Sequence, residues 1–262
     1  MINRRDFIGG AACGAVGGAV VARTTGAVPA PPAAPAPTPA PLPSALPEHG
    51  RLSFAQQGED ILLHHVFSEL LKITTPTYLD VGAAYPVLGN NTYLFYTAGS
   101  RGVLVEPNPS LATELRSKRP GDTVVEAGIG VADAVDADYF VIAGNAMLNT
   151  FSPAQVTRLQ QERPGTVVER VVKMPLLNIN RVIQEHLGRA PDLLSTDVEG
   201  LDEAIVRSLD LSRFRPGAIC METDPPAPTG QPSRISRYMA ANGYIARGAS
   251  LYNTIYVDIR RR

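Results

Sequence analysis

The sequence contains no tryptophan and only two cysteines, and aromatic residues make up 6% of its 262 positions. A platform of aromatic rings that stacks on sugars or bases is therefore not expected. Cys13 and Cys220 make no disulfide framework, and Cys220 stands in a short apolar run that is typical of a buried thiol. The net charge is −1, so no basic surface for nucleic acid is expected.

Long apolar runs are also missing. Residues 9–22 are rich in glycine and alanine, and this run is too short and too weakly apolar for a membrane span. It follows a twin-arginine pattern, Asn3 to Ile8, so residues 1–26 are predicted to be a signal read by the twin-arginine (Tat) export machinery. A leader that is retained would tether the protein to a membrane. A misassigned start codon is the alternative.

A linker rich in proline and alanine follows over residues 27–50. Its prolines exclude helix and sheet and favour an extended polyproline II spacer. Residues 51–262 are then long enough for one domain with a substantial core.

The most informative stretch is residues 76–108, PTYLDVGAAYPVLGNNTYLFYTAGSRGVLVEPN. It predicts a strand over 78–81, a short helix over 92–98 and a second strand that ends at Glu106, which together form a βαβ unit. Ligands of an open parallel sheet bind at the carboxyl ends of its strands. A carboxylate at the end of the second strand can accept hydrogen bonds from both hydroxyls of a ribose, each contributing about 1.5–3 kcal/mol.

The glycines of a phosphate-binding loop are absent after the first strand. Gly82 is followed by Ala83, Ala84, Tyr85 and Pro86, where a dinucleotide site needs G-x-G-x-x-G with free amides. An NAD site is therefore disfavoured. A nucleoside cofactor without phosphates fits better, and S-adenosylmethionine (SAM) fits best. The open alternative is an ordinary strand pair whose acids cap helices.

The predicted cofactor contacts lie along this stretch. The ribose of SAM is expected at Glu106, and its amino-acid end near Asp80 and Gly82. The small residues Gly82 and Ala83 would allow the cofactor to approach the backbone. Asn108 is assigned to the same site, although it can also cap the next helix, over 110–118. The adenine is expected near residues 126–130, whose glycines are equally typical of a turn.

Asp197 is the predicted catalytic residue. It follows a buried strand, Leu193 to Thr196, which would carry it to the same edge as Asp80 and Glu106. There it could accept a proton from an acceptor hydroxyl or orient the cofactor. Its other possible role is to cap the helix over 201–209. In a second version, oxygen atoms of Asp197, Glu222 and Asp224 bind Mg²⁺.

Two further segments have predicted roles around this edge. Glu59 opens an amphipathic helix over 59–71 and is assigned to the cofactor mouth, with N-terminal capping as its alternative. Residues 131–192 read as an insertion between core strands, with strands over 138–143 and 166–174 and helices over 153–162 and 178–187. Such an insertion can roof an acceptor site.

Six motifs in this order resemble the FkbM-type methyltransferases. The resemblance covers residues 53–258 and is carried by Ser53-Phe54 with Gln57-Gly58-Glu59-Asp60, Leu79-Asp80-Val81-Gly82-Ala83, Asn91-Thr92-Tyr93, Gly102-Val103-Leu104-Val105-Glu106-Pro107-Asn108-Pro109, Asp197-Val198-Glu199-Gly200 and Asn253-Thr254-Ile255-Tyr256.

The resemblance implies an α/β fold of class I. Its Rossmann-like sheet would have seven mostly parallel strands, with the last strand antiparallel and helices on both faces. It implies SAM-dependent O-methylation of a hydroxyl on a glycan, polyketide or similar metabolite. By motif, Asp80, Gly82 and Glu106 are expected to contact the cofactor, and Asp197 to be an acid of the active site.

The leader departs from this family, which is mostly cytoplasmic. SAM is made inside cells, so the cofactor supply favours a domain on the cytoplasmic side, whereas the leader favours export or an inner-membrane anchor. The alternative function is therefore an exported, non-catalytic binding domain built on a methyltransferase-like fold.

Overall fold

The computed structural model describes residues 50–198, 200–223 and 232–261. The predicted leader, the linker before Gly50, Glu199 and Asp224 lie outside the described residues. From Leu52 to Arg262 the chain forms one unit, built on a large sheet with helices on both faces and a smaller second sheet.

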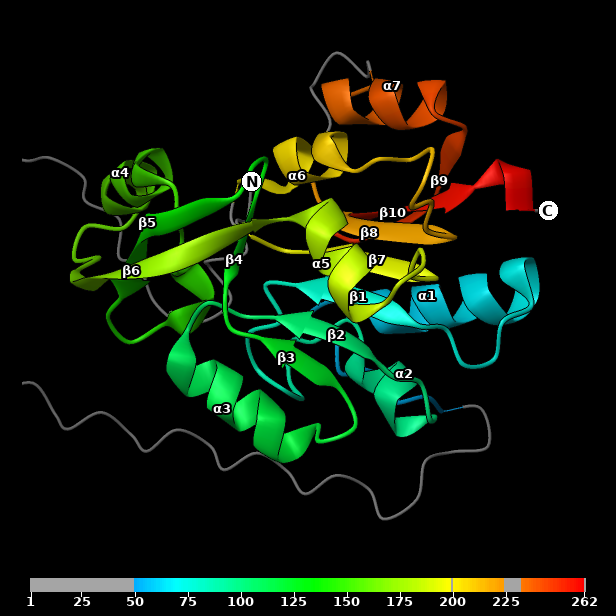
Figure 1. Ribbon diagram of the computed structural model, residues 1–262, viewed down its shortest axis with the longest axis horizontal. Coiled ribbons are helices and arrows are strands. Elements are labelled where there is room, and N and C mark those ends of the chain that lie inside the picture. The colour runs from blue at the N-terminus through cyan, green and yellow to red at the C-terminus, as the bar shows by residue number, and fades with distance from the viewer. Residues whose placement is uncertain (1–49, 199, 224–231, 262) are drawn as a thin grey trace, which may run out of the picture. The chain divides into compact units, whose positions relative to one another are not determined.

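Seven strands form the main sheet in the order β3-β2-β1-β7-β8-β10-β9 (Figure 1). Their bounds are Tyr78–Val81 (β1), Gly102–Val105 (β2), Thr123–Val125 (β3), Leu193–Thr196 (β7), Ala218–Glu222 (β8), Tyr244–Ala249 (β9) and Asn253–Asp258 (β10). Adjacent strands from β3 to β8 are parallel, whereas β10 is antiparallel to both of its neighbours. The predicted Rossmann-like sheet with a reversed last strand is confirmed.

The order of the strands reverses at the centre of the sheet. The chain builds outwards from β1 through β2 to β3, and then returns to place β7 on the other side of β1. The carboxyl ends of β1, β2 and β7 therefore meet at a switch point, where ligands of such sheets bind.

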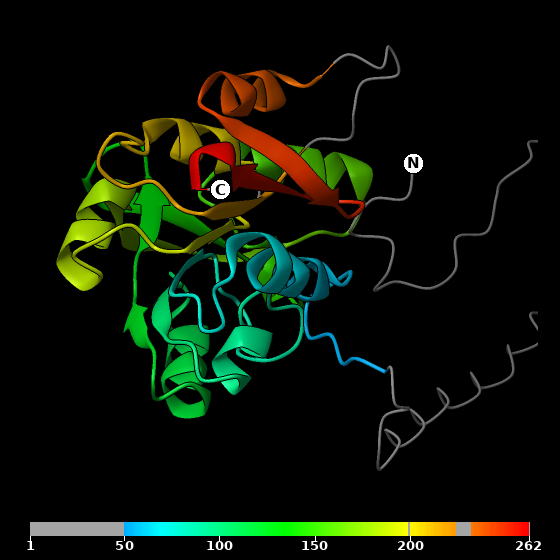
Figure 2. The ribbon, with the colours of Figure 1, turned by 90° about the vertical axis from the view of Figure 1, so that its right-hand side faces the viewer.

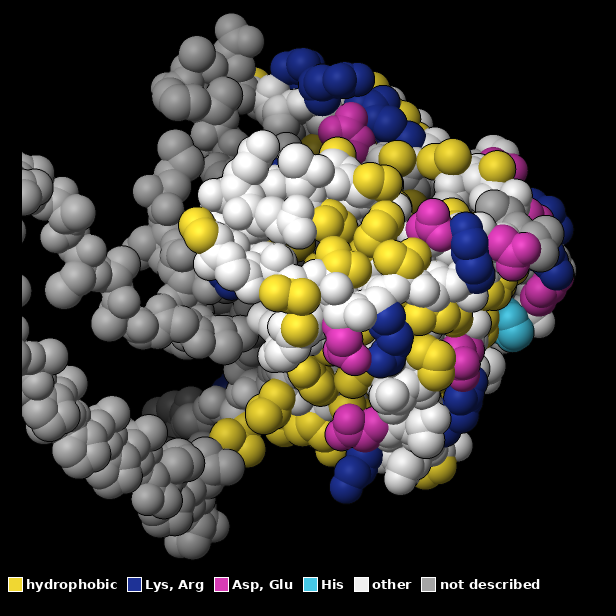
Figure 3. Space-filling model, turned by 90° about the vertical axis from the view of Figure 1, so that its left-hand side faces the viewer, with side chains coloured by type: hydrophobic (Ala, Val, Ile, Leu, Met, Phe, Trp, Pro, Cys, Tyr) yellow, Lys and Arg dark blue, Asp and Glu magenta, His cyan; other side chains and the backbone are white. Residues whose placement is uncertain are grey.

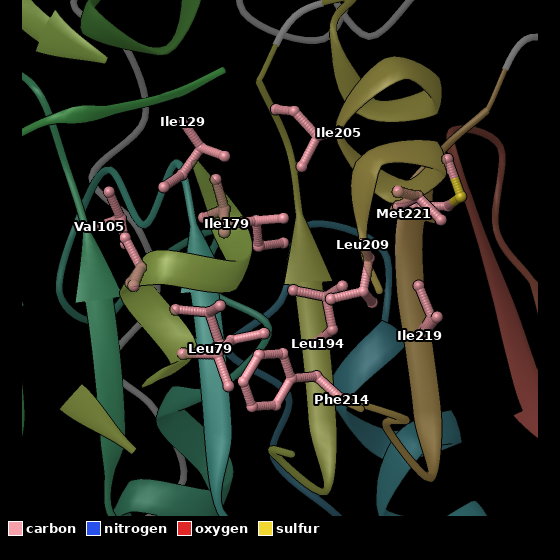
Figure 4. Close-up of a cluster of buried hydrophobic side chains, with 14 of the residues drawn as sticks. Leu79, Val105, Ile129, Ile179, Leu194, Ile205, Leu209, Phe214, Ile219 and Met221 are labelled. Atoms are coloured by element: carbon pink, nitrogen blue, oxygen red, sulfur yellow. The ribbon is translucent and has the colours of Figure 1, made fainter. Parts of the chain in front are cut away.

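Helices cover both faces of the main sheet. On one face lie α1 (Glu59–His65), its π-helical continuation η2 (Val66–Leu71), α2 (Tyr93–Thr97) and α3 (Pro109–Lys118); on the other lie α5 (Ile179–His186), α6 (Asp202–Ser208) and α7 (Arg234–Ala241). Figure 2 shows α1 (blue to cyan) and α7 (orange) on opposite sides of the C-terminal strands. Each face has its own buried hydrophobic cluster, and Figure 4 shows the one beneath α5 and α6.

The side chains of β1 alternate between these two clusters. Leu79 and Val81 pack in the cluster under α5, α6 and α7, whereas Tyr78 packs in the cluster under α1, α2 and α3. Since successive side chains of a strand point to opposite faces, Asp80 points to the same face as Tyr78. This alternation decides which strand residues reach the cavity described below.

A smaller sheet accounts for most of the predicted insertion. Its strands, in the order β4-β6-β5, are Gly128–Gly130 (β4), Ala134–Ile142 (β5) and Val168–Asn178 (β6), accompanied by the 3₁₀ helix η3 (Ala146–Leu148) and by α4 (Pro153–Glu162). The turn considered for Gly128 and Gly130 is replaced by strand β4. The insertion also ends earlier than predicted, because α5 packs Ile179 and Val182 into the main core.

Charges of both signs are spread over the side of the molecule that carries the smaller sheet (Figure 3). Exposed ion pairs on β5 and β6 join Lys173 to Asp138 and Arg170 to its neighbour Glu169. Within the part of the chain that the structure describes, no helix combines the length and apolarity needed to cross a bilayer.

Candidate active site

A hollow of about 530 Å³, including the part open to solvent, lies at the switch point of the main sheet. Gly82, Glu106 and Asp197 line it, each just beyond the end of a different strand, β1, β2 or β7. Ala127, Gly128 and Ile129 line it as well, where the adenine was expected. The structure therefore brings together three of the predicted site residues and the predicted adenine segment.

Glu106 is a buried carboxylate held by two backbone amides. Only 3% of the residue is exposed. Its Oε1 accepts a hydrogen bond of 2.7 Å from the amide of Asn108, and its Oε2 accepts one of 2.9 Å from the amide of Ala84. Burial raises the pKa of Glu106 from 4.5 to about 7, although the two amides favour its charged form. Each oxygen keeps a lone pair for a further donor.

Gly82 is also required for a reason that was not predicted. Its φ is +78°, and a Cβ on it would lie 2.2 Å from the carbonyl oxygen of Asp197. The absent side chain thus lets two stretches of backbone pack together, and this packing fixes Asp197 next to the end of β1. The amide of Asp197 also donates a hydrogen bond of 3.0 Å to the carbonyl of Val81.

Asp80 points away from the hollow, to the face covered by α1, α2 and α3. Its Oδ2 accepts hydrogen bonds from Thr92 Oγ1 at 2.7 Å and from Asn90 Nδ2 at 3.4 Å. Burial raises its pKa, and the nearby Arg119 opposes that shift. Asp80 does not line the hollow, so the side chain supports the loop after β1 from behind.

The other predicted contacts also lie outside the lining of this hollow. Ala83 is buried in the cluster under α1, α2 and α3. The side chain of Asn108 caps α3 by accepting a hydrogen bond of 3.1 Å from Ser110, while its backbone amide serves Glu106. Glu59 is fully buried and accepts hydrogen bonds from Ser250 Oγ at 2.7 Å and Asn253 Nδ2 at 2.9 Å.

A family model described as the methyltransferase FkbM domain matches residues 80–246, more than half of the chain. The chain belongs to this family. As a member of this family, the protein is a SAM-dependent methyltransferase, and S-adenosylmethionine is its methyl donor. The match begins at Asp80 and includes Gly82, Glu106 and Asp197.

Solved structures of methyltransferases are similar at low identity. Precorrin-6y C5,15-methyltransferase from Geobacter metallireducens is 13% identical, with a TM-score of 0.41, over 82% of this chain and 93% of its own. An O-methyltransferase from Bacillus cereus in complex with SAH is 15% identical, with a TM-score of 0.38, over 81% and 84% of the two chains. No curated protein matched the sequence.

The hollow of this FkbM-family domain suits the nucleoside part of SAM. Glu106 lies in it as a carboxylate with unused acceptor capacity, between apolar walls that include Val105, Ile129 and Phe151. A ribose supplies two hydroxyl donors for that acid, and adenine suits the apolar walls. The donor set therefore fits the cofactor, and Glu106 is the residue that would hold the ribose.

A wall of the hollow beside Glu106 comes from β5 and the segment after η3, and it was not predicted residue by residue. Tyr139, Asn149 and Phe151 line the hollow there, and the rings of Tyr139 and Phe151 lie 4.7 Å apart. Burial, followed by the charge of Glu106, raises the pKa of Tyr139. The insertion thus roofs the end of the hollow that holds Glu106. Tyr139 falls in a run predicted to be a strand, but the sequence did not show which face of that strand would meet Glu106.

Asp202 is a buried acid near Asp197 that the sequence analysis did not single out. It is the first residue of α6 and is 3% exposed, and its Oδ2 accepts a hydrogen bond of 3.4 Å from the amide of Val198. Burial, followed by the charge of Asp197, raises the pKa of Asp202 from 3.8 to about 7. Its position five residues after Asp197 could have indicated that the two acids lie close together. Acids are common in the first turn of a helix, however, so this position alone did not distinguish Asp202.

The metal alternative is only partly covered by the structure. Among the described residues, no group of three or more His, Cys, Asp or Glu side chains could hold a metal ion. Asp224 lies outside those residues, so Asp197 and Glu222 are the described members of the predicted set. Glu222 is the last residue of β8, where it pairs with Asn253 of β10.

Proposed function

We propose that this methyltransferase transfers the methyl group of SAM to a hydroxyl of a small-molecule or glycan acceptor, such as a polyketide or similar metabolite. The observation that supports this most is the position of Asp197, which is half-buried and lines the same hollow as Glu106. With the ribose at Glu106, as proposed, the reacting end of SAM would extend toward Asp197, which lies two strands away.

Asp197 would act as the base. When bound, SAM would supply the methyl group, and the electrons of its bond to carbon would stay on sulfur. Asp197 would accept the proton of an acceptor hydroxyl, which would leave an electron pair on the hydroxyl oxygen for the new bond to that methyl carbon. Holding the oxygen in line with the methyl group accounts for most of the remaining rate enhancement.

The test is Asp197→Asn, assayed with radiolabelled SAM and a panel of hydroxylated sugars and phenols. We expect turnover to fall by about 10²–10⁴-fold while the Kd for SAM changes little. The matched control is Asp138→Asn, an exposed acid on β5 that is paired with Lys173. Unchanged turnover in Asp197→Asn would reject the base, and acceptance of the methyl group by nitrogen or carbon acceptors alone would reject O-methylation.

A metal-assisted form of the same reaction would use Asp197, Glu222 and Asp224 to bind Mg²⁺, which would lower the pKa of the acceptor hydroxyl. Treatment with EDTA separates the two forms. Loss of activity that Mg²⁺ restores would support the metal-assisted form, and full activity in EDTA would exclude it.

The N-terminal sequence supports a second candidate function, a non-catalytic binding domain exported by the Tat machinery or tethered to the membrane by its leader. Protease treatment of spheroplasts reports which side of the membrane the domain occupies. Calorimetry with SAM then separates the two functions, because a domain that no longer binds SAM gives no heat of binding.

A further inference from the structure

Arg119 is fully buried although it carries a positive charge. It follows the last residue of α3, and its guanidinium donates hydrogen bonds to Asp122 at 2.8 Å, Tyr78 Oη at 2.9 Å, Thr92 Oγ1 at 3.0 Å and Asn90 Oδ1 at 3.0 Å. A buried cation is costly unless its donors are satisfied. Asp122 supplies the opposite charge, and two of the other contacts join Arg119 to the loop after β1.

The guanidinium helps to fix which way the amide of Asn90 points. Asn90 Oδ1 faces Arg119 and also accepts a hydrogen bond of 2.9 Å from the amide of Thr92. Because one end of the amide is an acceptor and the other a donor, Nδ2 must face the opposite way. There it donates to the carbonyl of Ala83 at 3.1 Å and to the carbonyl of Tyr85 at 3.3 Å.

Those two carbonyls flank a residue in an unfavourable conformation. Ala84 has a φ of +50°, in the left-handed region that residues other than glycine rarely adopt. Such a residue persists where its surroundings hold it, and Asn90 holds the carbonyl on either side. In this conformation the amide of Ala84 donates its 2.9 Å hydrogen bond to Glu106 Oε2.

We infer that Arg119 and Asn90 are positioning residues of the cofactor site. Arg119 orients the amide of Asn90, Asn90 keeps Ala84 in its left-handed conformation, and the amide of Ala84 orients the carboxylate of Glu106 toward the ribose. The inference rests on Glu106 as the ribose contact, and it is independent of the acceptor and of the role of Asp197.

A ligand pair separates positioning from simple support of the fold. Calorimetry gives the Kd of S-adenosylhomocysteine and of its 2′,3′-dideoxyribose analogue, and the ratio of the two Kd values measures the contribution of the ribose hydroxyls. The variants are Asn90→Ala and Arg119→Lys. Arg119→Lys retains the charge but cannot reach all four acceptors at once. The control, Arg116→Lys, lies one turn earlier on α3, where Arg116 is exposed and paired with Glu126.

Two hydrogen bonds to a charged group should make the wild type prefer the ribose ligand by about tenfold or more. We expect Asn90→Ala to reduce this preference to about threefold or less. Arg119→Lys should give an intermediate ratio, and Arg116→Lys should leave the ratio unchanged. A cooperative thermal unfolding transition shows that each variant is folded. If Asn90→Ala does not fold, Arg119→Lys alone provides the test.

Equal losses of affinity for both ligands would overturn the inference, because they would show that the network supports the fold alone. An unchanged ratio in both folded variants would overturn it as well. A wild type that binds neither ligand would instead count against the cofactor and the proposed function, so the two failures are distinguishable.

Discussion

The carbonyl oxygen of Asp197 lies 2.2 Å from the place that a Cβ on Gly82 would occupy. The end of β1 and the end of β7 are therefore in direct backbone contact at this point. Any residue larger than glycine at position 82 must separate the two strand ends, and such a shift would move Asp197 relative to Glu106.

The variant Gly82→Ala tests this contact. We expect it to lower the free energy of unfolding by more than ~2 kcal/mol, because the left-handed backbone and the clash with Asp197 both add to the cost. Gly144→Ala is the matched control, since Gly144 has a φ of +74° but nothing within 4 Å of an added Cβ. Urea unfolding measures both variants. Equal losses would show that the backbone conformation, and not the contact, sets the requirement.

Glu106→Gln should weaken SAM binding. The amide retains one acceptor but loses the negative charge, and a hydrogen bond to a charged group contributes about 1.5–3 kcal/mol, so we expect the Kd to rise about 10–100-fold. Calorimetry at pH 8, where Glu106 is ionised, gives the comparison. Glu114→Gln, an exposed position on α3, should bind SAM as the wild type does. An unchanged Kd in Glu106→Gln would contradict the assignment of the ribose contact.

Cofactor binding and fold stability should depend on pH in opposite ways. Glu106 has a pKa of about 7 in the folded protein and 4.5 as its ordinary value, so between these values the folded state holds the extra proton. Its contribution to stability is present below about pH 4.5 and is lost as the pH rises to about 7, by up to about 1.4 kcal/mol per pH unit. SAM affinity should rise over the same range, because the carboxylate is the stronger acceptor.

Urea unfolding from pH 4.5 to 8 and calorimetry over the same range test these two trends. The fall in stability with pH should be less steep in Glu106→Gln than in the wild type. A wild type and a Glu106→Gln variant with the same pH dependence would show that this carboxyl group titrates in its ordinary range.

Asp202→Asn should stabilise the unliganded protein more at pH 8 than at pH 5. The pKa of Asp202 is raised from 3.8 to about 7, so wild-type stability falls as the pH rises between these two values, and at pH 8 the side chain is a buried anion beside Asp197. We expect the gain at pH 8 to exceed the gain at pH 5 by about 1–3 kcal/mol in urea unfolding. Exposed Asp210, whose pKa is lowered by hydrogen bonds from Ser212, is the control, and Asp210→Asn should give no gain at either pH.

The sequence was sufficient to predict the strands of the main sheet and the edge at which they carry acids. Glu106 and Asp197 were predictable because each follows a short apolar strand, and the carboxyl ends of parallel strands share one edge. The direction of the Asp80 side chain was not predictable. Strand β1 is buried on both faces, so its residues read as a continuous buried run, and the pattern does not show which face Asp80 takes.

The rest of the site depends on contacts between distant parts of the chain. Asp80 faces a network centred on Arg119, 39 residues later, and no local pattern indicates that this arginine is fully buried. Tyr139 reaches Glu106 only because the smaller sheet folds over the end of β2. Glu59 looked like a residue at the cofactor mouth, yet its partners Ser250 and Asn253 lie almost 200 positions away.

The reversed strand β10 has a consequence for how the polypeptide is made. It lies between β8 and β9, although it is the last strand to be synthesised. Until the last residues of the domain have left the ribosome, β8 has an unpaired edge. Over the same period Glu59 lacks its partner Asn253. The domain can therefore close only after nearly all of its chain has left the ribosome.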